Sequence, residues 1–522
     1  MKFFIVLMLF GAFLRFYRLD HYPLPMHQDE LSEAYDAYSI VETGRDRAGD
    51  TMPFVVRASG PGDYRPALYV WLTTIPMKFT GFSVTASRVP SAVLGVLSLA
   101  IVFFFATALI DKTFGSIALT FAVFSPWHMT YSRLAHSGAM LPAFFVILVL
   151  WLWRRAAERE YPASHVLSIG IALGLSASAY QSTRLIGPMM LVLIATDLAR
   201  FSPRRKKSLA TLVIAAGIAA LPQLYVMVTA PEKFFARLAG TASESRGAVS
   251  IMANLVGNLG FVFSPKVLFW PNMVSTGYVA VRLIPIELPF FYLGLFTLYR
   301  LQPARIPRFR AYVYITFFIA IFPALLTAQA FSMRISAVLL LLPLWTAAGV
   351  LWSARKLRER GLRFEAFFGG LGVAATACFA FVAWMYLWSA RANGQQSNNA
   401  LVQVGERLKT LNVPYRKVFV VDSPWYAGMH VAAFSGMKPV EYQRTHVATV
   451  DARGWDYLTS VGKYHFLKPR EMAGVVRASC SSPERELIVS RNKVDGILPL
   501  DSVAWVTEKY YFTELSPRSH CP

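Results

Sequence analysis

The sequence predicts an α-helical polytopic membrane protein with a separate α/β domain at its C-terminal end. The 522 residues are 55% hydrophobic and only 16% charged, with a mean hydropathy of +0.43, which is too apolar for a soluble chain. Long apolar runs recur from residue 3 to residue 388. After residue 388 the chain becomes polar, and short runs typical of strands appear beside an amphipathic segment.

The net charge of +22 does not by itself indicate a nucleic-acid-binding protein. Lys and Arg gather in short clusters between the apolar runs, as they do in the cytoplasmic loops of membrane proteins. We find no RNA- or DNA-binding motif. We therefore expect membrane lipid as a partner, and no nucleic acid.

The first apolar run, Phe3 to Leu14, resembles the core of a signal peptide. It lacks a small-x-small cleavage site and is followed by Arg15 and Arg18, so we predict an uncleaved helix that extends toward Tyr17. The mostly polar residues 18–85 then form a first outer loop.

The later apolar runs bring the predicted total to about eleven membrane spans, several of them short for a bilayer. A second long outer loop, 229–284, is expected to contain short helices at the membrane interface. The later runs lie at about 88–110, 114–131, 138–153, 163–180, 185–199, 208–228, 285–299, 311–328, 334–352 and 364–388.

Basic residues follow the even-numbered spans, which sets the orientation. The clusters include Arg154 and Arg155, Arg204 to Lys207, Arg305 to Arg310, and Arg355 to Arg363. By the positive-inside rule these loops face the cytoplasm, and so does the N-terminus. We therefore predict a multi-pass protein of the bacterial inner (plasma) membrane, with its C-terminal domain outside the cytoplasm.

The predicted boundary between the two domains lies at residue 388. Residues 1–388 form the transmembrane domain, and residues 389–522 form the extracytoplasmic α/β domain. Strands are expected at Lys417–Asp422 and Glu486–Ser490, and a helix at 400–411. Export of this domain would allow a disulfide between Cys480 and Cys521, with two free thiols as the alternative.

The segment from His27 to Asp36 holds four carboxylates within eight positions. In a helix, Asp29, Glu33 and Asp36 share one face, where like charges oppose each other. Folding alone gives little reason for such a cluster, whereas a general base or a cation site beside a membrane would explain it. The alternative is an ordinary helix start, with Asp29 as N-cap and the acids favoured by the helix dipole.

Arginines lie near the ends of several predicted spans, on the same membrane face as Asp29. An arginine at this depth needs an anionic partner, and its guanidinium fork matches phosphate oxygens. We therefore predict a cavity with a base on one side and a phosphate clamp on the other, although headgroup contact or a protein ion pair would explain any single arginine. The candidate substrate-binding residues are Arg65, Arg133, Arg184 and Arg334, together with Tyr180 and His128.

Metal-ligating residue types also gather at the acidic segment, where His27 precedes Asp29, Glu30 and Glu33. Their spacing is not that of a tight metal motif. We predict no metal and no other cofactor, with a divalent metal at these residues as the alternative.

Four segments together resemble polytopic glycosyltransferases of the GT-C type. The likeness is in particular to the protein O-mannosyltransferase and lipid A aminoarabinose transferase relatives, and among them to bacterial glycosyltransferases that depend on a phospholipid carrier. The resemblance covers roughly the first 200 residues well, the later spans only in topology, and the tail only in position and length. The segments are His27–Asp46, Arg88–Gly95, Ser125–Arg133 and Tyr180–Pro188.

The resemblance implies transfer of a sugar from a polyprenyl-phosphate carrier to a glycan, lipid or protein acceptor at the outer membrane face. It implies that Asp29 deprotonates the acceptor hydroxyl with support from Glu30. Arg133 and Arg184 would hold the carrier phosphate, with Arg65 as a further candidate for the same role. In-line displacement would invert the anomeric centre. The alternative function is a multi-span lipid or glycan transporter or flippase, but the acids lie in a loop and we find no clear internal repeat.

Overall fold

The computed structural model describes residues 2–515 with short gaps. The gaps are 24–25, 59–62, 242–246, 271, 274–278, 281, 302–305, 329–332, 362–363, 393–395, 412, 423, 451–455, 481, 495–496 and 506–507. The chain forms two compact units, which we describe separately. The helical unit consists of Met1–Asp20, Arg65–Tyr69 and Arg88–Trp388, and the loop–tail unit of His21–Tyr64, Val70–Ser87 and Ser389–Pro522.

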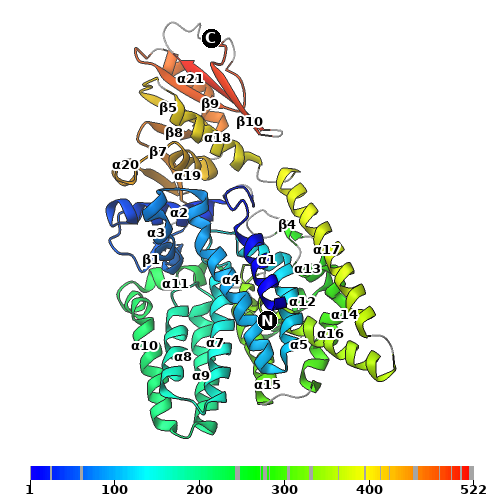
Figure 1. Ribbon diagram of the computed structural model, residues 1–522. Coiled ribbons are helices and arrows are strands. Elements are labelled where there is room, and N and C mark those ends of the chain that lie inside the picture. The colour runs from blue at the N-terminus through cyan, green and yellow to red at the C-terminus, as the bar shows by residue number, and fades with distance from the viewer. Residues whose placement is uncertain are drawn as a thin grey trace. The chain divides into compact units, whose positions relative to one another are not determined.

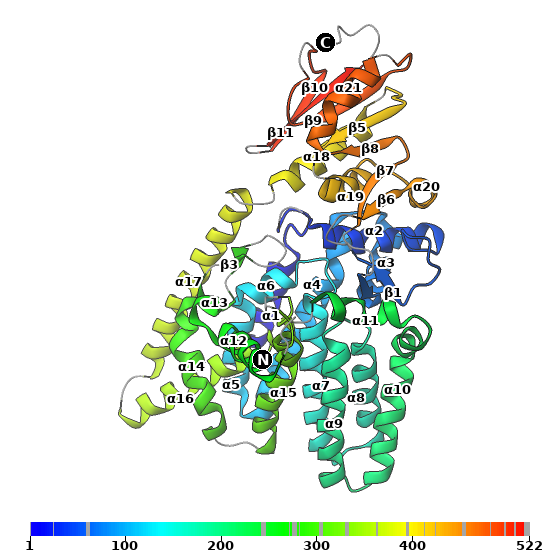
Figure 2. The ribbon, with the colours of Figure 1, turned by 180° about the vertical axis from the view of Figure 1, so that it is seen from behind.

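The first half of the helical unit is a set of packed helices, in which α7 to α10 lie side by side (Figures 1 and 2). Gly170 and Gly174 on α8 let α10 approach closely, because a Cβ at Gly174 would lie 2.3 Å from the Ala216 carbonyl oxygen. The helices are α1 (Lys2–Phe16), α4 (Val84–Leu109), α5 (Lys112–Phe124), α6 (Pro126–Tyr131), α7 (Met140–Glu158), α8 (Ala163–Ser176), α9 (Thr183–Phe201) and α10 (Arg205–Thr229).

The second half of the helical unit begins with helices in the segment 229–284, as expected, while their place at the membrane interface stays a prediction. They are α11 (Pro231–Thr241), α12 (Ala248–Phe263) and α13 (Pro265–Phe269), followed by the paired strands β3 (Asn272–Met273) and β4 (Val279–Ala280). Then come η1 (Pro285–Glu287), α14 (Leu288–Thr297), η2 (Leu298–Arg300), α15 (Arg308–Leu325), η3 (Ser336–Val338), α16 (Leu342–Glu359) and α17 (Phe364–Ala392).

Five helical segments of the described chain are long and apolar enough to cross a membrane, judged by length and composition. They are Val84–Leu109, Met140–Glu158, Arg205–Thr229, Arg308–Leu325 and Ser336–Glu359. The expected run 114–131 is interrupted, because Ser125 caps a new helix that has Pro126 in its first turn. The protein is therefore a multi-pass membrane protein, and the total of about eleven spans stays a prediction.

The loop–tail unit contains a seven-stranded sheet in the order β10-β11-β9-β5-β8-β7-β6, in which β5 runs parallel to β8 and β9. The sheet strands are β5 (Lys417–Val421), β6 (Val447–Val450), β7 (Asp456–Val461), β8 (Tyr464–Leu467), β9 (Glu486–Ser490), β10 (Asp501–Trp505) and β11 (Glu508–Leu515). The tail helices are α18 (Gln396–Thr410), α19 (Pro424–Phe434), α20 (Pro439–Thr445), η4 (Pro469–Glu471) and α21 (Met472–Cys480). Both predicted strands and the predicted helix are confirmed, whereas the Cys480 side chain and Cys521 lie outside the described residues.

The loop–tail unit also holds the acidic segment, which forms α2 (Gln28–Thr43) and packs against α19 and α20. The loop continues through β1 (Val55–Arg57) and β2 (Tyr64–Pro66) into α3 (Leu68–Thr80). The loop–tail unit resumes at Ser389, and the predicted domain boundary at residue 388 stays a prediction. Residues 21–64 of the first outer loop belong to the same compact unit as the C-terminal tail, and not to the helical unit.

Candidate active site

The helix α2 begins with a capping box built by His27 and Glu30. The Asp29 amide donates to Nδ1 of His27 at 3.2 Å, and the His27 amide donates to Oε2 of Glu30 at 3.1 Å. At the other end, Gly44 adopts a left-handed φ of 71° and its N–H donates to the Ile40 carbonyl. The N-cap is therefore His27 and not Asp29, and the acidic segment is helical.

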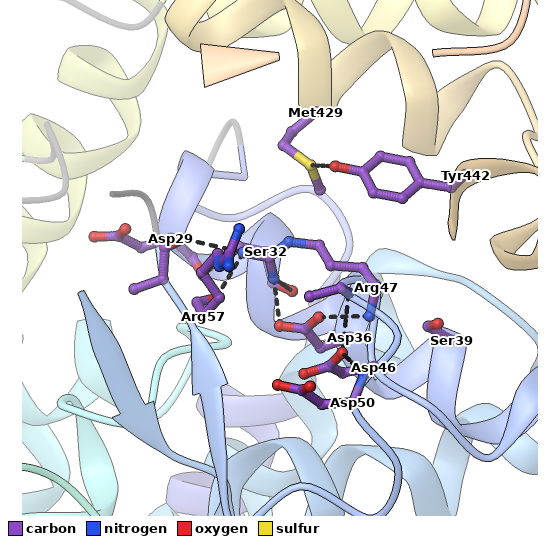
Figure 3. Close-up of polar contacts among 12 residues, drawn as sticks. Asp29, Ser32, Asp36, Ser39, Asp46, Arg47, Asp50, Arg57, Met429 and Tyr442 are labelled. Atoms are coloured by element: carbon purple, nitrogen blue, oxygen red, sulfur yellow. Dashed lines mark hydrogen bonds and ion pairs between the residues drawn. The ribbon is translucent and has the colours of Figure 1, made fainter. Parts of the chain in front are cut away.

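The four carboxylates of this segment differ sharply in exposure. Glu30, Glu33 and Asp36 are 0%, 2% and 1% exposed. The side chain of Asp29 keeps 23% of its surface, and its Oδ2 lies 3.6 Å from Nδ1 of His27. Figure 3 shows the Asp29 carboxylate apart from the Asp36 and Asp46 carboxylates. Asp29 is thus the carboxylate of the four that another molecule can reach.

The buried Asp36 is paired with Arg47, which the sequence analysis did not single out. Nη1 of Arg47 contacts Oδ2 of Asp36, and the Arg47 amide donates to Oδ1 at 3.1 Å. The same guanidinium donates to the carbonyls of Ser32 at 3.0 Å, Arg57 at 2.6 Å and Ala58 at 3.1 Å (Figure 3). Burial raises the pKa of Asp36 to about 7, although Arg47 opposes this shift. The pair joins the following loop and β1 to α2, which explains an acid at this position.

Arg133 donates to the carbonyls at the end of α1. Its Nη1 lies 2.7 Å from the Leu14 oxygen, and its Nη2 lies 2.7 Å from the Tyr17 oxygen and 3.1 Å from the Arg18 oxygen. A helix end leaves carbonyls without intrahelical donors, and a cation is favourable there. Arg133 thus anchors the end of α1, and its role at a carrier phosphate stays a prediction.

His128 lies in α6 and is 1% exposed. Its Nδ1 is 2.8 Å from Nη2 of Arg15, and its Nε2 is 2.9 Å from Oγ of Ser98. Because a guanidinium only donates, Nδ1 is the acceptor and Nε2 carries the hydrogen. Both ring nitrogens therefore join α6 to α1 and α4, and substrate binding by His128 stays a prediction.

Arg184 lies in the first turn of α9, beside the segment that follows α10. Its Nη1 donates to the Phe234 carbonyl at 2.5 Å, its Nη2 donates to Oε1 of Gln223 at 2.7 Å, and the guanidinium lies 4.0 Å from the centroid of the Phe234 ring. Its Nε is buried and has no hydrogen-bond partner among the described residues. Among the candidate arginines, Arg184 thus retains a donor for an anionic ligand.

The remaining candidates also lie in the helical unit. Arg65 in β2 is 2% exposed, and the nearby Leu68 amide donates to the Ser178 carbonyl at 3.3 Å. The Tyr180 ring lies 6.1 Å from the His136 ring. The segments that carry Arg65 and Tyr180 therefore meet, while Arg334 lies half-buried in a turn before η3.

The described residues contain no group of three or more His, Cys, Asp or Glu side chains arranged to hold a metal ion. The expectation of no cofactor stays a prediction.

Comparison with known proteins supports the fold. Residues 64–225 match a family model described as dolichyl-phosphate-mannose-protein mannosyltransferase. The structure is similar to ArnT from Cupriavidus metallidurans bound to undecaprenyl phosphate, with a TM-score of 0.57 and 14% identity over 99% of this chain and 98% of that chain. ArnT in the apo state gives the same TM-score and coverage at 12% identity. No curated protein matches the sequence.

A more distant likeness is to the archaeal oligosaccharyltransferase AglB from Archaeoglobus fulgidus, with a TM-score of 0.48 and 15% identity over 83% of this chain and 63% of that chain. The family match over residues 64–225 and the ArnT-like fold agree with the resemblance to GT-C-type glycosyltransferases that the sequence predicts.

Proposed function

We propose that the protein is an inverting glycosyltransferase of the bacterial inner membrane. It moves a sugar from a polyprenyl-phosphate carrier to an acceptor at the outer face of the membrane. The GT-C fold supports this proposal, as does the undecaprenyl phosphate bound to the similar ArnT structure. The observation that carries it for this chain is the exposure of Asp29 on a capped helix whose other early acids are buried.

In this reaction Asp29 is the general base. The acceptor hydroxyl oxygen attacks the anomeric carbon, its proton passes to the Asp29 carboxylate, and the bond from the anomeric carbon to the carrier phosphate breaks. The electron pair of that bond leaves with the phosphate, and in-line attack inverts the anomeric centre. Glu30 supports the base indirectly, because its carboxylate caps the helix start.

The carrier phosphate gains negative charge as it leaves, and nearby cations stabilise that charge. Arg184 is the strongest candidate, because its Nε is buried without a partner among the described residues. Arg65 and Arg133 are assigned supporting roles in the same clamp. The apolar helices supply the surroundings that the prenyl chain requires.

Complementation of a strain that lacks the protein tests the role of Asp29. Mass spectrometry should show envelope glycans that return with the native chain and with Glu42→Gln, a control at an exposed acid of the same helix. With Asp29→Asn, the rate of glycan formation per copy of protein should fall about 10²- to 10⁴-fold. A rate within about threefold of the native rate would exclude Asp29 as the base. Transbilayer movement of undecaprenyl phosphate without any sugar transfer would instead favour a flippase.

A further inference from the structure

The tail contacts α2 by hydrogen bonds at the start, the middle and the end of the helix. Nε2 of His430, which is fully buried in α19, lies 3.1 Å from the Met26 carbonyl oxygen. The Tyr35 hydroxyl donates to the Met437 carbonyl at 3.0 Å. The third contact is made at the end of α2 by Nε2 of Gln443, which lies in α20. These contacts bring together residues that are about 400 positions apart in the chain, which only the folded tail can do.

The contact at the end of α2 is the most extensive of the three. Nε2 of Gln443 lies 2.9 Å from Oγ of Ser39, 3.0 Å from Oγ1 of Thr43 and 2.8 Å from the Asp46 carbonyl oxygen. An amide has two N–H hydrogens, so the three acceptors share them. This contact holds both the last turn of α2 and the chain that leaves it.

Aromatic packing surrounds these hydrogen bonds. The Tyr35 ring lies 5.2 Å from the Tyr442 ring and 6.2 Å from the Phe82 ring, and Phe82 lies 5.7 Å from Phe434. Apolar burial is non-directional and would hold α2 in more than one rotation about its axis. Hydrogen bonds at both ends of the helix set its rotation and its position along the axis.

The contact at the start of α2 leads directly to Asp29. His430 binds the carbonyl of Met26, the residue before the N-cap His27. Nδ1 of His27 in turn accepts the Asp29 amide at 3.2 Å. The tail thus fixes the peptide from which the capping box and the Asp29 side chain are built.

We propose that His430 and Gln443 are positioning residues, by which the tail holds α2 so that Asp29 meets the acceptor hydroxyl in a reactive geometry. This inference rests on the proposed role of Asp29 as the base. It gives the tail domain a function within the transfer reaction, since a displacement of about 1 Å at a reacting group costs up to about 100-fold in rate.

The test uses the full chain in nanodiscs and in complemented cells. His430→Phe keeps a ring but removes the donor, and Gln443→Met keeps the length of the side chain without its amide. His430→Gln restores an N–H donor and serves as the rescue variant. Asp501→Asn is the matched control, because it neutralises the carboxylate that accepts a hydrogen bond from Arg407 at 2.5 Å elsewhere in the tail.

Three measurements are made on each variant: the rate of glycan formation per copy, the affinity for undecaprenyl phosphate, and hydrogen–deuterium exchange of amides 27–36. We expect His430→Phe and Gln443→Met to lower the rate about 10- to 100-fold, with faster exchange in α2 and unchanged affinity. His430→Gln should recover most of the rate, and Asp501→Asn should match the native chain.

Unchanged rate and exchange in both variants would overturn the inference, and so would a parallel loss of rate, affinity and folded protein. Exchange in α2 is measured without any reaction, so the two proposals fail separately. If Asp29→Asn keeps its activity, Asp29 is not the base, whether or not the tail variants change hydrogen exchange in α2. If Asp29→Asn is inactive and the tail variants behave like the native chain, only the positioning role is wrong.

Discussion

Asp197 in the helical unit and Asp36 in the loop–tail unit are both 1% exposed, but they are satisfied in different ways. Asp197 accepts hydrogen bonds from four side chains on two other helices and the turn between α7 and α8. The donors are Trp153 Nε1 at 2.7 Å, Tyr161 OH at 2.5 Å, Arg308 Nε at 2.8 Å and Tyr312 OH at 2.8 Å. The contacts of Asp36 come from the backbone and the guanidinium of Arg47.

Asp197 therefore joins several helices, whereas Asp36 binds only a nearby loop residue, Arg47. A carboxylate has about four acceptor positions, and the four donors to Asp197 fill them. Asp36 relies on one neighbouring residue, and burial raises its pKa to about 7. An acid inside an apolar span is a default candidate for function. For Asp197 the saturated donor set indicates instead that it stabilises the packing of α7, α9 and α15.

The largest effect expected from this comparison is the loss of stability in Asp197→Ala. The change leaves Arg308 without this buried partner, and such a change typically costs about 3–5 kcal/mol. The free energy of unfolding can be measured by detergent titration in mixed micelles. Asp29→Asn is the control and should shift it by less than about 0.5 kcal/mol, as expected for a substitution outside the core. Equal losses of unfolding free energy in Asp197→Ala and Asp29→Asn would contradict the stabilising role given to Asp197.

Sequence reasoning located the local features of the site. The spacing of the acids is consistent with α2, and the apolar runs predict β5 and β9, because these patterns depend on residues a few positions apart. It did not identify the partners of Asp197, which lie 36 to 115 positions away. Sequence reasoning also did not predict that α2 packs against the tail. Such contacts are set by tertiary packing and leave no local pattern.

The arginines show the same limit at the candidate site. They lie near the ends of apolar runs, and Arg133 and Arg184 both make part-buried contacts there. The sequence does not show which acceptors an arginine will meet. A helix end offers carbonyl oxygens that bind a guanidinium as a phosphate does. Arg133 meets three of them, and this was not predictable from its neighbours in the sequence.

The second prediction concerns the pH dependence of stability that Asp36 contributes. Its pKa is about 7 in the folded chain and near 3.8 ordinarily, so between these values the folded state binds more protons than the unfolded state. Its contribution is therefore present below about pH 4 and is lost as the pH rises through 7, at up to about 1.4 kcal/mol per pH unit. Thermal unfolding from pH 4 to 8 should show this fall for the native chain relative to Asp36→Asn. Parallel curves for the two proteins would refute it.

The smallest expected effects concern the removal of one tyrosine hydroxyl in each unit. Tyr312→Phe removes one of the four donors to Asp197, while its ring can remain stacked 4.4 Å from the Trp153 ring. A hydrogen bond to a charged group contributes about 1.5–3 kcal/mol. In the loop–tail unit, the Tyr442 hydroxyl donates to Sδ of Met429 at 3.3 Å, and a thioether is a weak acceptor (Figure 3). Tyr442→Phe should therefore cost less than about 0.5 kcal/mol. If Tyr442→Phe costs as much as Tyr312→Phe in the same titration, saturation of Asp197 by donors is not what distinguishes the two regions.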